Sequence, residues 1–191
     1  GIAVTASHNP KDWNGLKFIS RDGLYLTPHQ TDEFLDLYDQ GDYAFVGPEK
    51  IRPIRAEDRP VEPHLSKILD RFGAGRIRRR KFKVALDCGN GAGAILAPRL
   101  LEAFGCETVL INAVPDGSFS RPSEPTPENI REICRTVVKA KADVGFVQDA
   151  DADRLAIVDE RGRPLGEELT LALAVQSILG REKGPVVCNL S

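Results

Sequence analysis

Three aspartates stand at alternating positions in one short loop. Asp149, Asp151 and Asp153 are followed at once by Arg154, and apolar segments lie on both sides. In extended backbone every second side chain points the same way, so the three carboxylates can converge on one hard cation. An ordinary solvated turn would avoid the repulsion between three like charges by using Gly, Asn or Ser. The pattern therefore predicts a site for a divalent cation, and Mg²⁺ is the expected ion.

The same segment does not fit an EF-hand calcium loop. Glu160 falls twelfth when Asp149 is counted first, but Arg154 occupies the sixth position, where that loop requires glycine. The flanking residues also have the pattern of strands rather than helices. Arg154 instead offers a guanidinium fork beside the carboxylates, which suits a phosphate oxygen.

A serine hydroxyl and an imidazole are neighbours in a polar loop near the N-terminus. Residues 5–10 read Thr-Ala-Ser-His-Asn-Pro, and residues 14–17 read Asn-Gly-Leu-Lys. Ser7 could serve as a nucleophile or phosphate carrier, with His8 beside it and the ammonium group of Lys17 further along the chain. A structural loop with the histidine hydrogen-bonded to the backbone would have the same residues. On this loop alone both interpretations stay open.

Two further segments carry weaker signals. Residues 87–93 read Asp-Cys-Gly-Asn-Gly-Ala-Gly, but they match neither the G-x-G-x-x-G dinucleotide pattern nor a Walker motif. We expect a tight turn between a strand and a helix there. Residues 76–81 read Arg-Ile-Arg-Arg-Arg-Lys without interleaved aromatic residues, which predicts a solvated surface turn rather than a phosphate-binding patch.

The elements that must position these loops alternate between strand and helix. Apolar runs predict strands over residues 2–4, 16–19, 83–86, 108–111, 143–147, 155–158 and 185–190. Helical periodicity and boundary residues predict helices over residues 28–40, 65–72, 94–104, 127–138 and 167–179. Such alternation is typical of an α/β fold with a mixed, mostly parallel sheet flanked by helices. The proline-rich and charged residues 42–62 predict a connecting region with a boundary near residue 60.

Composition argues against several classes of protein. The 191 residues suffice for one or two globular domains. With 28 Asp and Glu against 26 Lys and Arg the net charge is −2, so we expect no nucleic-acid partner. No apolar run approaches the about 20 residues that span a bilayer, so we expect no membrane association. The four cysteines are scattered without a C-x-x-C pair, which indicates thiols in a cytoplasmic protein rather than zinc ligands or disulfides.

Taken together, these segments resemble the α-D-phosphohexomutase superfamily, the group of phosphoglucomutases, phosphomannomutases and phosphoglucosamine mutases. The loop with Ser7, together with Lys17, looks like that family's phosphoserine loop, and residues 149–154 look like its metal loop. Residues 87–93 and 124–129 resemble turns of its second domain. The order and spacing of these motifs match over essentially the whole chain.

The resemblance implies a four-domain enzyme, of which this chain would hold a part. Residues 1–60 would be the C-terminal half of domain 1, residues 61–162 domain 2, and residues 163–191 the start of domain 3. The family's sugar-reading loop and its distal phosphate-binding loop have no match here, so we expect the isolated chain to lack turnover. One departure is Ala150, where the family usually has glycine, and a left-handed backbone at that position would be strained.

The implied reaction interconverts hexose 1-phosphate and hexose 6-phosphate. Ser7 would give its phosphoryl group to a substrate hydroxyl and take back the other phosphate of the resulting hexose bisphosphate. Mg²⁺ would be held by the aspartates of residues 149–153 and by a phosphoserine oxygen, with Arg154 on a phosphate oxygen. Lys17 and His8 are both candidates for proton handling near Ser7.

Two other functions stay open on the sequence. An aspartyl-phosphate phosphatase with Asp149 as nucleophile would also use a D-x-D pattern and Mg²⁺, although it leaves the Ser7 loop unexplained. A non-catalytic module that binds a sugar phosphate or a metal would need no nucleophile. Acid-stable phosphate on the protein would distinguish phosphoserine from an acyl phosphate.

Overall fold

The structure is a computed structural model that describes residues 1–57 and 59–187. The chain forms two compact units. The first unit contains Gly1–Thr5 and Asn14–Pro60, and the second contains Ala6–Trp13 and the residues from Val61 onward. The loop with Ser7 therefore groups with the second unit, apart from the strands that flank it in sequence.

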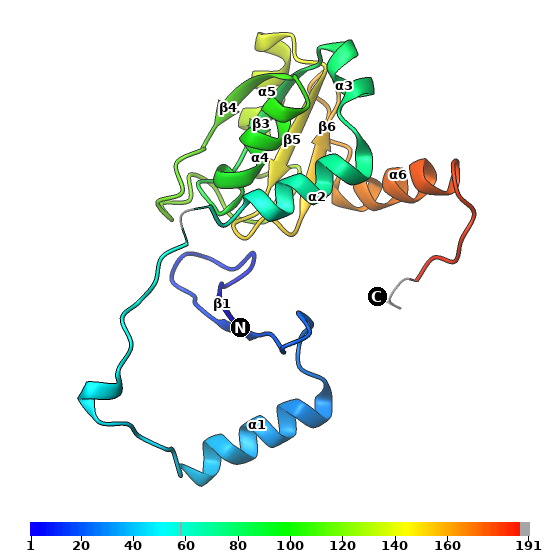
Figure 1. Ribbon diagram of the computed structural model, residues 1–191. Helices are drawn as coiled ribbons and strands as arrows, with labels where there is room; N and C mark the ends of the chain where they lie inside the picture. The colour runs from blue at the N-terminus through cyan, green and yellow to red at the C-terminus, as the bar shows by residue number, and fades with distance from the viewer. Residues whose placement is uncertain (58, 188–191) are drawn as a thin grey trace. The chain divides into compact units, whose positions relative to one another are not determined.

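The first unit is built on a short hairpin and one helix (Figure 1). Its elements are β1 (Ile2–Val4), β2 (Leu16–Phe18), α1 (Pro28–Gln40) and the 3₁₀ turn η1 (Pro48–Lys50). The strands pair antiparallel, with Ala3 opposite Lys17. Thr27 and Gln30 form a capping box at the start of α1, and Gly41 ends the helix with a φ of 65°. The predicted bounds of this helix are confirmed.

The second unit is a four-stranded sheet with helices around it (Figure 1). Its elements are α2 (Glu62–Phe72), α3 (Gly75–Arg80), β3 (Lys83–Asp87), α4 (Gly93–Ala103), β4 (Glu107–Ile111), α5 (Arg131–Ala140), β5 (Val144–Gln148), β6 (Leu155–Val158) and α6 (Glu167–Leu179). The strand order is β4-β3-β5-β6, and only the β5–β6 pair is antiparallel. The predicted mostly parallel α/β fold is confirmed.

This topology brings two of the sequence motifs to one edge of the sheet. Because β3 and β5 are parallel neighbours, their last residues, Asp87 and Gln148, lie at the same end. The glycine-rich turn follows β3 directly, and residues 149–154 form the loop of the hairpin that joins β5 to β6. Parallel sheets commonly place their functional loops at this carboxyl end.

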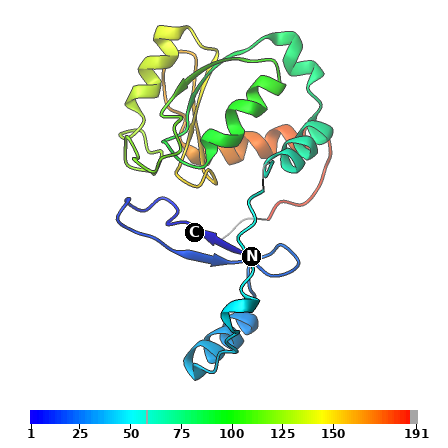
Figure 2. The same ribbon diagram turned by 60° about the vertical axis from the view of Figure 1, so that its left-hand side comes forward.

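The best-packed core lies between the sheet and α5. Ile133 and Val137 on α5 are fully buried and belong to one cluster with Ala85, Val147 and Val158 from three strands. Because alternate strand residues point to opposite faces, the remaining apolar side chains face the other side. Figure 2 shows α4 and α5 on opposite sides of the sheet. The core therefore fixes the strands whose ends carry the candidate site.

Three predicted elements differ from the structure. The helix expected over 127–138 begins only at Arg131. A turn precedes it, in which Asn129 N donates to the Thr126 carbonyl at 2.9 Å. Pro127 is as compatible with this turn as with the first turn of a helix. The arginine run expected as a turn forms the short helix α3, since arginine is a good helix former, and its arginines remain exposed. In the strand expected over 185–190, residues 185–187 are irregular and the rest lie outside the described residues.

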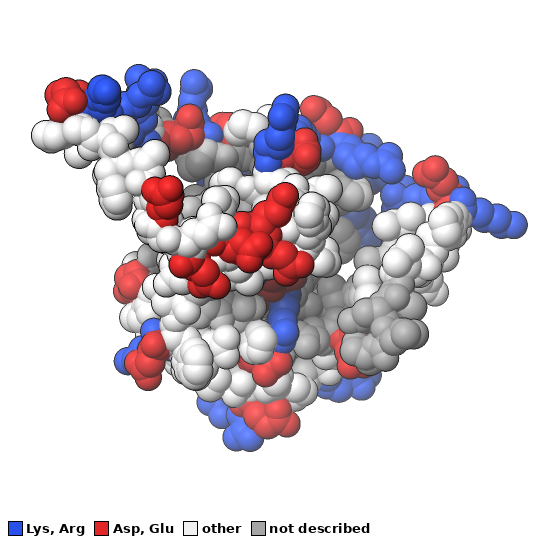
Figure 3. All heavy atoms as spheres, turned by 90° about the horizontal axis from the view of Figure 1, so that it is seen from below, with Lys and Arg blue, Asp and Glu red and all other residues white. Residues whose placement is uncertain are grey.

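The structure also bears on the apolar content of the helices and on the placement of charged side chains. No helix among the described residues is both long enough and apolar enough to cross a bilayer. The sequence has 26 basic and 28 acidic residues, and side chains of both kinds occur on the face seen in Figure 3.

Candidate functional site

The hairpin loop between β5 and β6 brings three carboxylates together. Asp149, Asp151 and Asp153 each offer an oxygen, and these oxygens lie within 4.8 Å of one another. Asp149 is fully buried, and its Oδ1 accepts a hydrogen bond from the Arg154 backbone N at 3.0 Å. The predicted convergence of the three side chains is therefore present in the structure.

Burial leaves the Asp149 carboxylate poorly solvated. Desolvation raises its pKa from 3.8 to about 6; the Arg154 N–H opposes the shift, and the negative charges of Asp151 and Asp153 add to it. The second oxygen, Oδ2, is buried and has no hydrogen-bond partner among the described residues. Leaving such an oxygen without a partner costs free energy, which a bound cation would offset. Carboxylate oxygens are the ligands that Mg²⁺ prefers, so the residues present fit that ion.

The glycine-rich turn after β3 supports the backbone of this loop. Ala92 N donates to the Ala150 carbonyl at 2.8 Å. A Cβ at Gly91 would collide with that same carbonyl, so only glycine allows the two segments to approach this closely. Ala150 itself is not in the left-handed region, and the strain considered for it is absent. The left-handed residue of the loop is Ala152, with a φ of 62°.

Arg154 contributes to the loop through its backbone and its side chain. Its Nη1 donates to Glu124 Oε1 at 2.8 Å, and the two side chains are 32% and 42% exposed. The guanidinium that we expected on a phosphate oxygen therefore forms an ion pair with a residue from a distant segment. No sequence signal identified Glu124 as this partner.

The Ser7 loop has an unusual backbone. Ser7 has a φ of 54°, a conformation that costs a residue with a side chain on the order of 1–3 kcal/mol. Its Oγ lies 3.3 Å from His8 Nδ1, so the structure brings these two predicted residues together. The turn is closed by Asn9, whose N and Nδ2 donate to the Ala6 carbonyl at 3.1 and 2.9 Å. Lys17, the other predicted residue, lies in β2 of the first unit.

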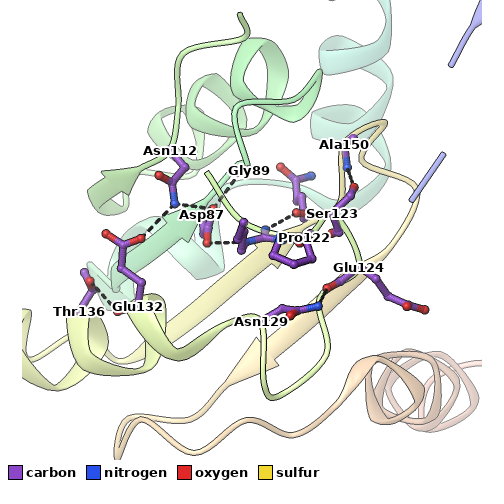
Figure 4. A network of polar contacts seen from close by, with 12 residues as sticks. Asp87, Gly89, Asn112, Pro122, Ser123, Glu124, Asn129, Glu132, Thr136 and Ala150 are labelled. Carbon is purple, nitrogen blue, oxygen red and sulfur yellow. Dashed lines mark hydrogen bonds and ion pairs between the residues drawn. The ribbon is translucent and has the colours of Figure 1, made fainter. Parts of the chain in front are cut away.

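A network of polar contacts surrounds the ends of β3 and β5 (Figure 4). It includes Asp87, the last residue of β3, which accepts hydrogen bonds from Gly89 N at 2.8 Å and from Asn112 Nδ2 at 3.2 Å. Ser123 is also part of it and accepts a hydrogen bond from Ala150 N at 2.9 Å. The sequence did not single out these individual contacts, because they join segments far apart in the chain.

The fold and the loops together match one known family of enzymes. The family model described as phosphoglucomutase/phosphomannomutase, alpha/beta/alpha domain II, matches residues 62–162, and the model of domain I matches residues 1–44. The chain belongs to the phosphoglucomutase/phosphomannomutase family, which confirms the resemblance to the α-D-phosphohexomutases.

Individual relatives are similar along nearly the whole chain. A probable phosphoglucosamine mutase from Methanopyrus kandleri is 37% identical over 186 residues, 97% of this chain and 40% of that protein. A phosphoglucomutase/phosphomannomutase from Thermococcus kodakarensis is 36% identical over 185 residues, 96% of this chain and 40% of that protein. The crystal structure of a phosphoglucomutase/phosphomannomutase family protein from Burkholderia thailandensis has a TM-score of 0.68 at 28% identity and covers 94% of this chain and 38% of that one. This chain therefore spans about two fifths of the length of its curated relatives.

Proposed function

We propose that this chain carries the phosphoryl-transfer half of a phosphohexomutase site, with Ser7 as the phosphate carrier. The observation that carries the proposal is the cluster of Asp149, Asp151 and Asp153 around a buried carboxylate oxygen without a partner, in a chain of the phosphoglucomutase/phosphomannomutase family. The substrate is a hexose phosphate and a hexose bisphosphate is the intermediate. In this proposal residues 1–60 are the C-terminal half of domain 1, residues 61–162 are domain 2, and residues 163–191 are the start of domain 3.

In the first transfer, the P–O bond at Ser7 Oγ breaks and a bond from phosphorus to a substrate hydroxyl oxygen forms. The proton of that hydroxyl passes to a base, for which His8 and Lys17 are the candidates. In the second transfer, the other phosphate of the bisphosphate moves to Ser7 Oγ, and the proton returns to the sugar oxygen that is released. The 3.3 Å distance between Ser7 Oγ and His8 Nδ1 supports His8 as a group that orients the carrier.

The three aspartates of the loop would hold Mg²⁺. When bound, the ion supplies positive charge that offsets the negative charge on the transferring phosphoryl group. The Arg154 N–H keeps Asp149 in place through its Oδ1, which leaves Oδ2 for the cation. Glu124 holds the Arg154 side chain at the rim of the loop, where a substrate phosphate could compete for the guanidinium.

The proposal is tested in the protein that contains this chain by comparing Ser7→Ala with the control Ser20→Ala. Mass spectrometry after mild acid should find phosphate on Ser7 in the unaltered protein, because phosphoserine survives acid whereas an acyl phosphate does not. Turnover is measured on glucose, mannose and glucosamine phosphates with a hexose bisphosphate as activator. We expect Ser7→Ala to remove the phosphate and the turnover, and Ser20→Ala to keep both.

Two outcomes would contradict the proposal. Full turnover in Ser7→Ala would show that another group carries the phosphate. Acid-labile phosphate at Asp149 together with phosphatase activity would favour an aspartyl-phosphate enzyme instead. The side-by-side assay of the three sugars also identifies the preferred substrate.

A further inference from the structure

Arg121 connects the carboxyl ends of two neighbouring strands. Its Nε donates to Asp87 Oδ2 at 3.0 Å at the end of β3, and its Nη2 donates to the Gln148 carbonyl at 2.7 Å at the end of β5. Its Nη1 donates to the carbonyls of Pro122 and Ser123 at 3.1 and 3.0 Å. One guanidinium therefore fixes two strand ends and the segment from which it comes.

The charge that anchors Arg121 is itself fully buried and well satisfied. The Asp87 side chain is 1% exposed and that of Arg121 is 9% exposed. The remaining oxygen of Asp87 accepts hydrogen bonds from Gly89 N and from Asn112 Nδ2. A buried pair with this many hydrogen bonds holds its partners in one geometry, whereas removing one partner leaves an uncompensated charge.

The residues after Arg121 contact the metal loop twice more. Ser123 Oγ accepts the hydrogen bond of Ala150 N at 2.9 Å, and Glu124 pairs with Arg154 at 2.8 Å. In Figure 4, Ser123 and Ala150 face one another across the two segments. Residues 121–124, which we call the brace, thus hold the loop at both ends and in the middle.

The contacts of the brace lie at residues other than the three aspartates. It holds residues 148, 150 and 154, whereas the carboxylates are at 149, 151 and 153. The loop is a turn in which Ala152 N donates to the Asp149 carbonyl at 3.2 Å and Ala152 has a φ of 62°. Holding the backbone of Gln148 and Ala150 therefore fixes the start of this turn, and with it the directions in which its side chains leave the backbone. The two bonds of Arg121 and Ser123 to this hairpin are made to backbone atoms, the Gln148 carbonyl and Ala150 N, so these two residues act on the cluster through the backbone.

We propose that Arg121 and Ser123 are positioning residues for the metal loop, and that they set its divalent-ion affinity without being ligands. This inference rests on the proposed function in which that loop binds Mg²⁺. Residues that orient metal ligands typically change metal affinity by about 10- to 100-fold when they are lost. Without the brace, the hairpin loop keeps its three aspartates but not their common direction.

The test uses conservative variants of the chain, each with a matched control. Arg121→Lys keeps a positive charge for Asp87 but cannot also reach the Gln148 carbonyl. The control Arg78→Lys removes a bond from an exposed arginine to the Ala103 carbonyl, outside the metal loop. Ser123→Ala removes the acceptor of Ala150 N, and Ser118→Ala removes an acceptor of Asn90 Nδ2 outside the metal loop.

Two measurements are made below the melting temperature. Amide hydrogen exchange of residues 149–154 reports the order of the loop without any metal. Titration with Mn²⁺, followed by electron paramagnetic resonance, reports the affinity of the site. In Arg121→Lys and Ser123→Ala we expect loop exchange at least about 10-fold faster and Mn²⁺ affinity about 10-fold weaker, with α5 exchange unchanged. The control variants should match the unaltered chain.

The alternative is that the brace only adds stability. In that case both variants would melt earlier while loop exchange and Mn²⁺ affinity stayed within about twofold of the unaltered chain, and the inference would be wrong. If the unaltered chain bound no Mn²⁺, the proposed metal function would fail and this inference with it, because there would be no affinity to set. Altered loop exchange would then show only that the brace orders the hairpin.

Discussion

At the scale of single residues, the effect of the loop's negative charges on ion binding can be measured separately from their effect on stability. Asp151→Asn keeps the shape of the side chain and removes one charge from three that repel one another. We expect Mg²⁺ affinity, measured by titration calorimetry, to fall by about tenfold or more. The metal-free melting temperature should change little or rise, because the repulsion is reduced.

The control for this variant is Asp70→Asn, which alters an exposed aspartate on α2. It should leave Mg²⁺ affinity and melting temperature unchanged. Equal Mg²⁺ affinity in Asp151→Asn and the unaltered chain would mean that the three carboxylates do not form the ion site.

Cys88 provides a second test at this scale. It is fully buried in the turn after β3, and burial together with the neighbouring charge of Asp87 raises the pKa of its thiol to about 11, against a smaller opposing effect of Arg121. Only the thiolate reacts with alkylating reagents, so Cys88 should stay unmodified in the folded chain at pH 8 and react after unfolding. Mass mapping after a timed iodoacetamide pulse measures this. Modification of folded Cys88 as fast as that of Cys106 would show that the turn opens readily.

The three aspartates were easier to predict from the sequence than the residues that support their loop. Asp149, Asp151 and Asp153 stand in one short segment, and their alternation is visible in the sequence. Arg121 and Ser123 contact residues that follow them by 25 positions or more, and nothing local marks them as partners of the loop. Such contacts depend on which strands become neighbours, and that is decided by packing of the whole sheet.

At the scale of elements, α5 supplies the core contacts that fix β3, β5 and β6. Ile133 is 0% exposed, so Ile133→Ala should lower the free energy of unfolding by about 2–5 kcal/mol through lost burial and a cavity. Val138→Ala on the same helix, where the side chain is 54% exposed, should cost less than about 0.5 kcal/mol. Urea unfolding measures both. Similar losses for the two variants would contradict the packing described for α5.

The apolar periodicity of α5 was sufficient to predict that a helix forms, but the predicted start at Pro127 was wrong, because the helix begins at Arg131. Pro127 is compatible with both a helix start and a turn, and local sequence does not choose between them. The structure uses the turn to place Asn129, whose Nδ2 donates to the Glu124 carbonyl at 3.0 Å. Hydrogen bonds within residues 124–129 thus hold a turn where the sequence pattern predicted the start of the helix.

At the scale of the whole molecule, the residues before and after position 60 differ in how much they bury. Among the described residues of 1–60 none is buried, whereas the second unit contains the α5 core. We therefore expect amide hydrogen exchange to be faster in residues 1–60 than in 61–162. The isolated 191-residue chain should also show no measurable mutase turnover, because the transfer requires the substrate to be held in line with the donor. Turnover equal to that of full-length family members would show that the substrate site lies within this chain.

The pairing of Gln148 with Leu155 closes the hairpin loop, so residues 149–154 lie between two fixed points of the sheet. This register therefore fixes the number of residues in the loop. Side chains within the loop can be exchanged one at a time, but an inserted or deleted residue would change the turn, in which Ala152 has a φ of 62°, and would move the three carboxylates relative to one another. Changes of length are therefore expected in the segment between Gly41 and Pro60, where none of the residues that the structure describes pairs with a strand, and not in this hairpin.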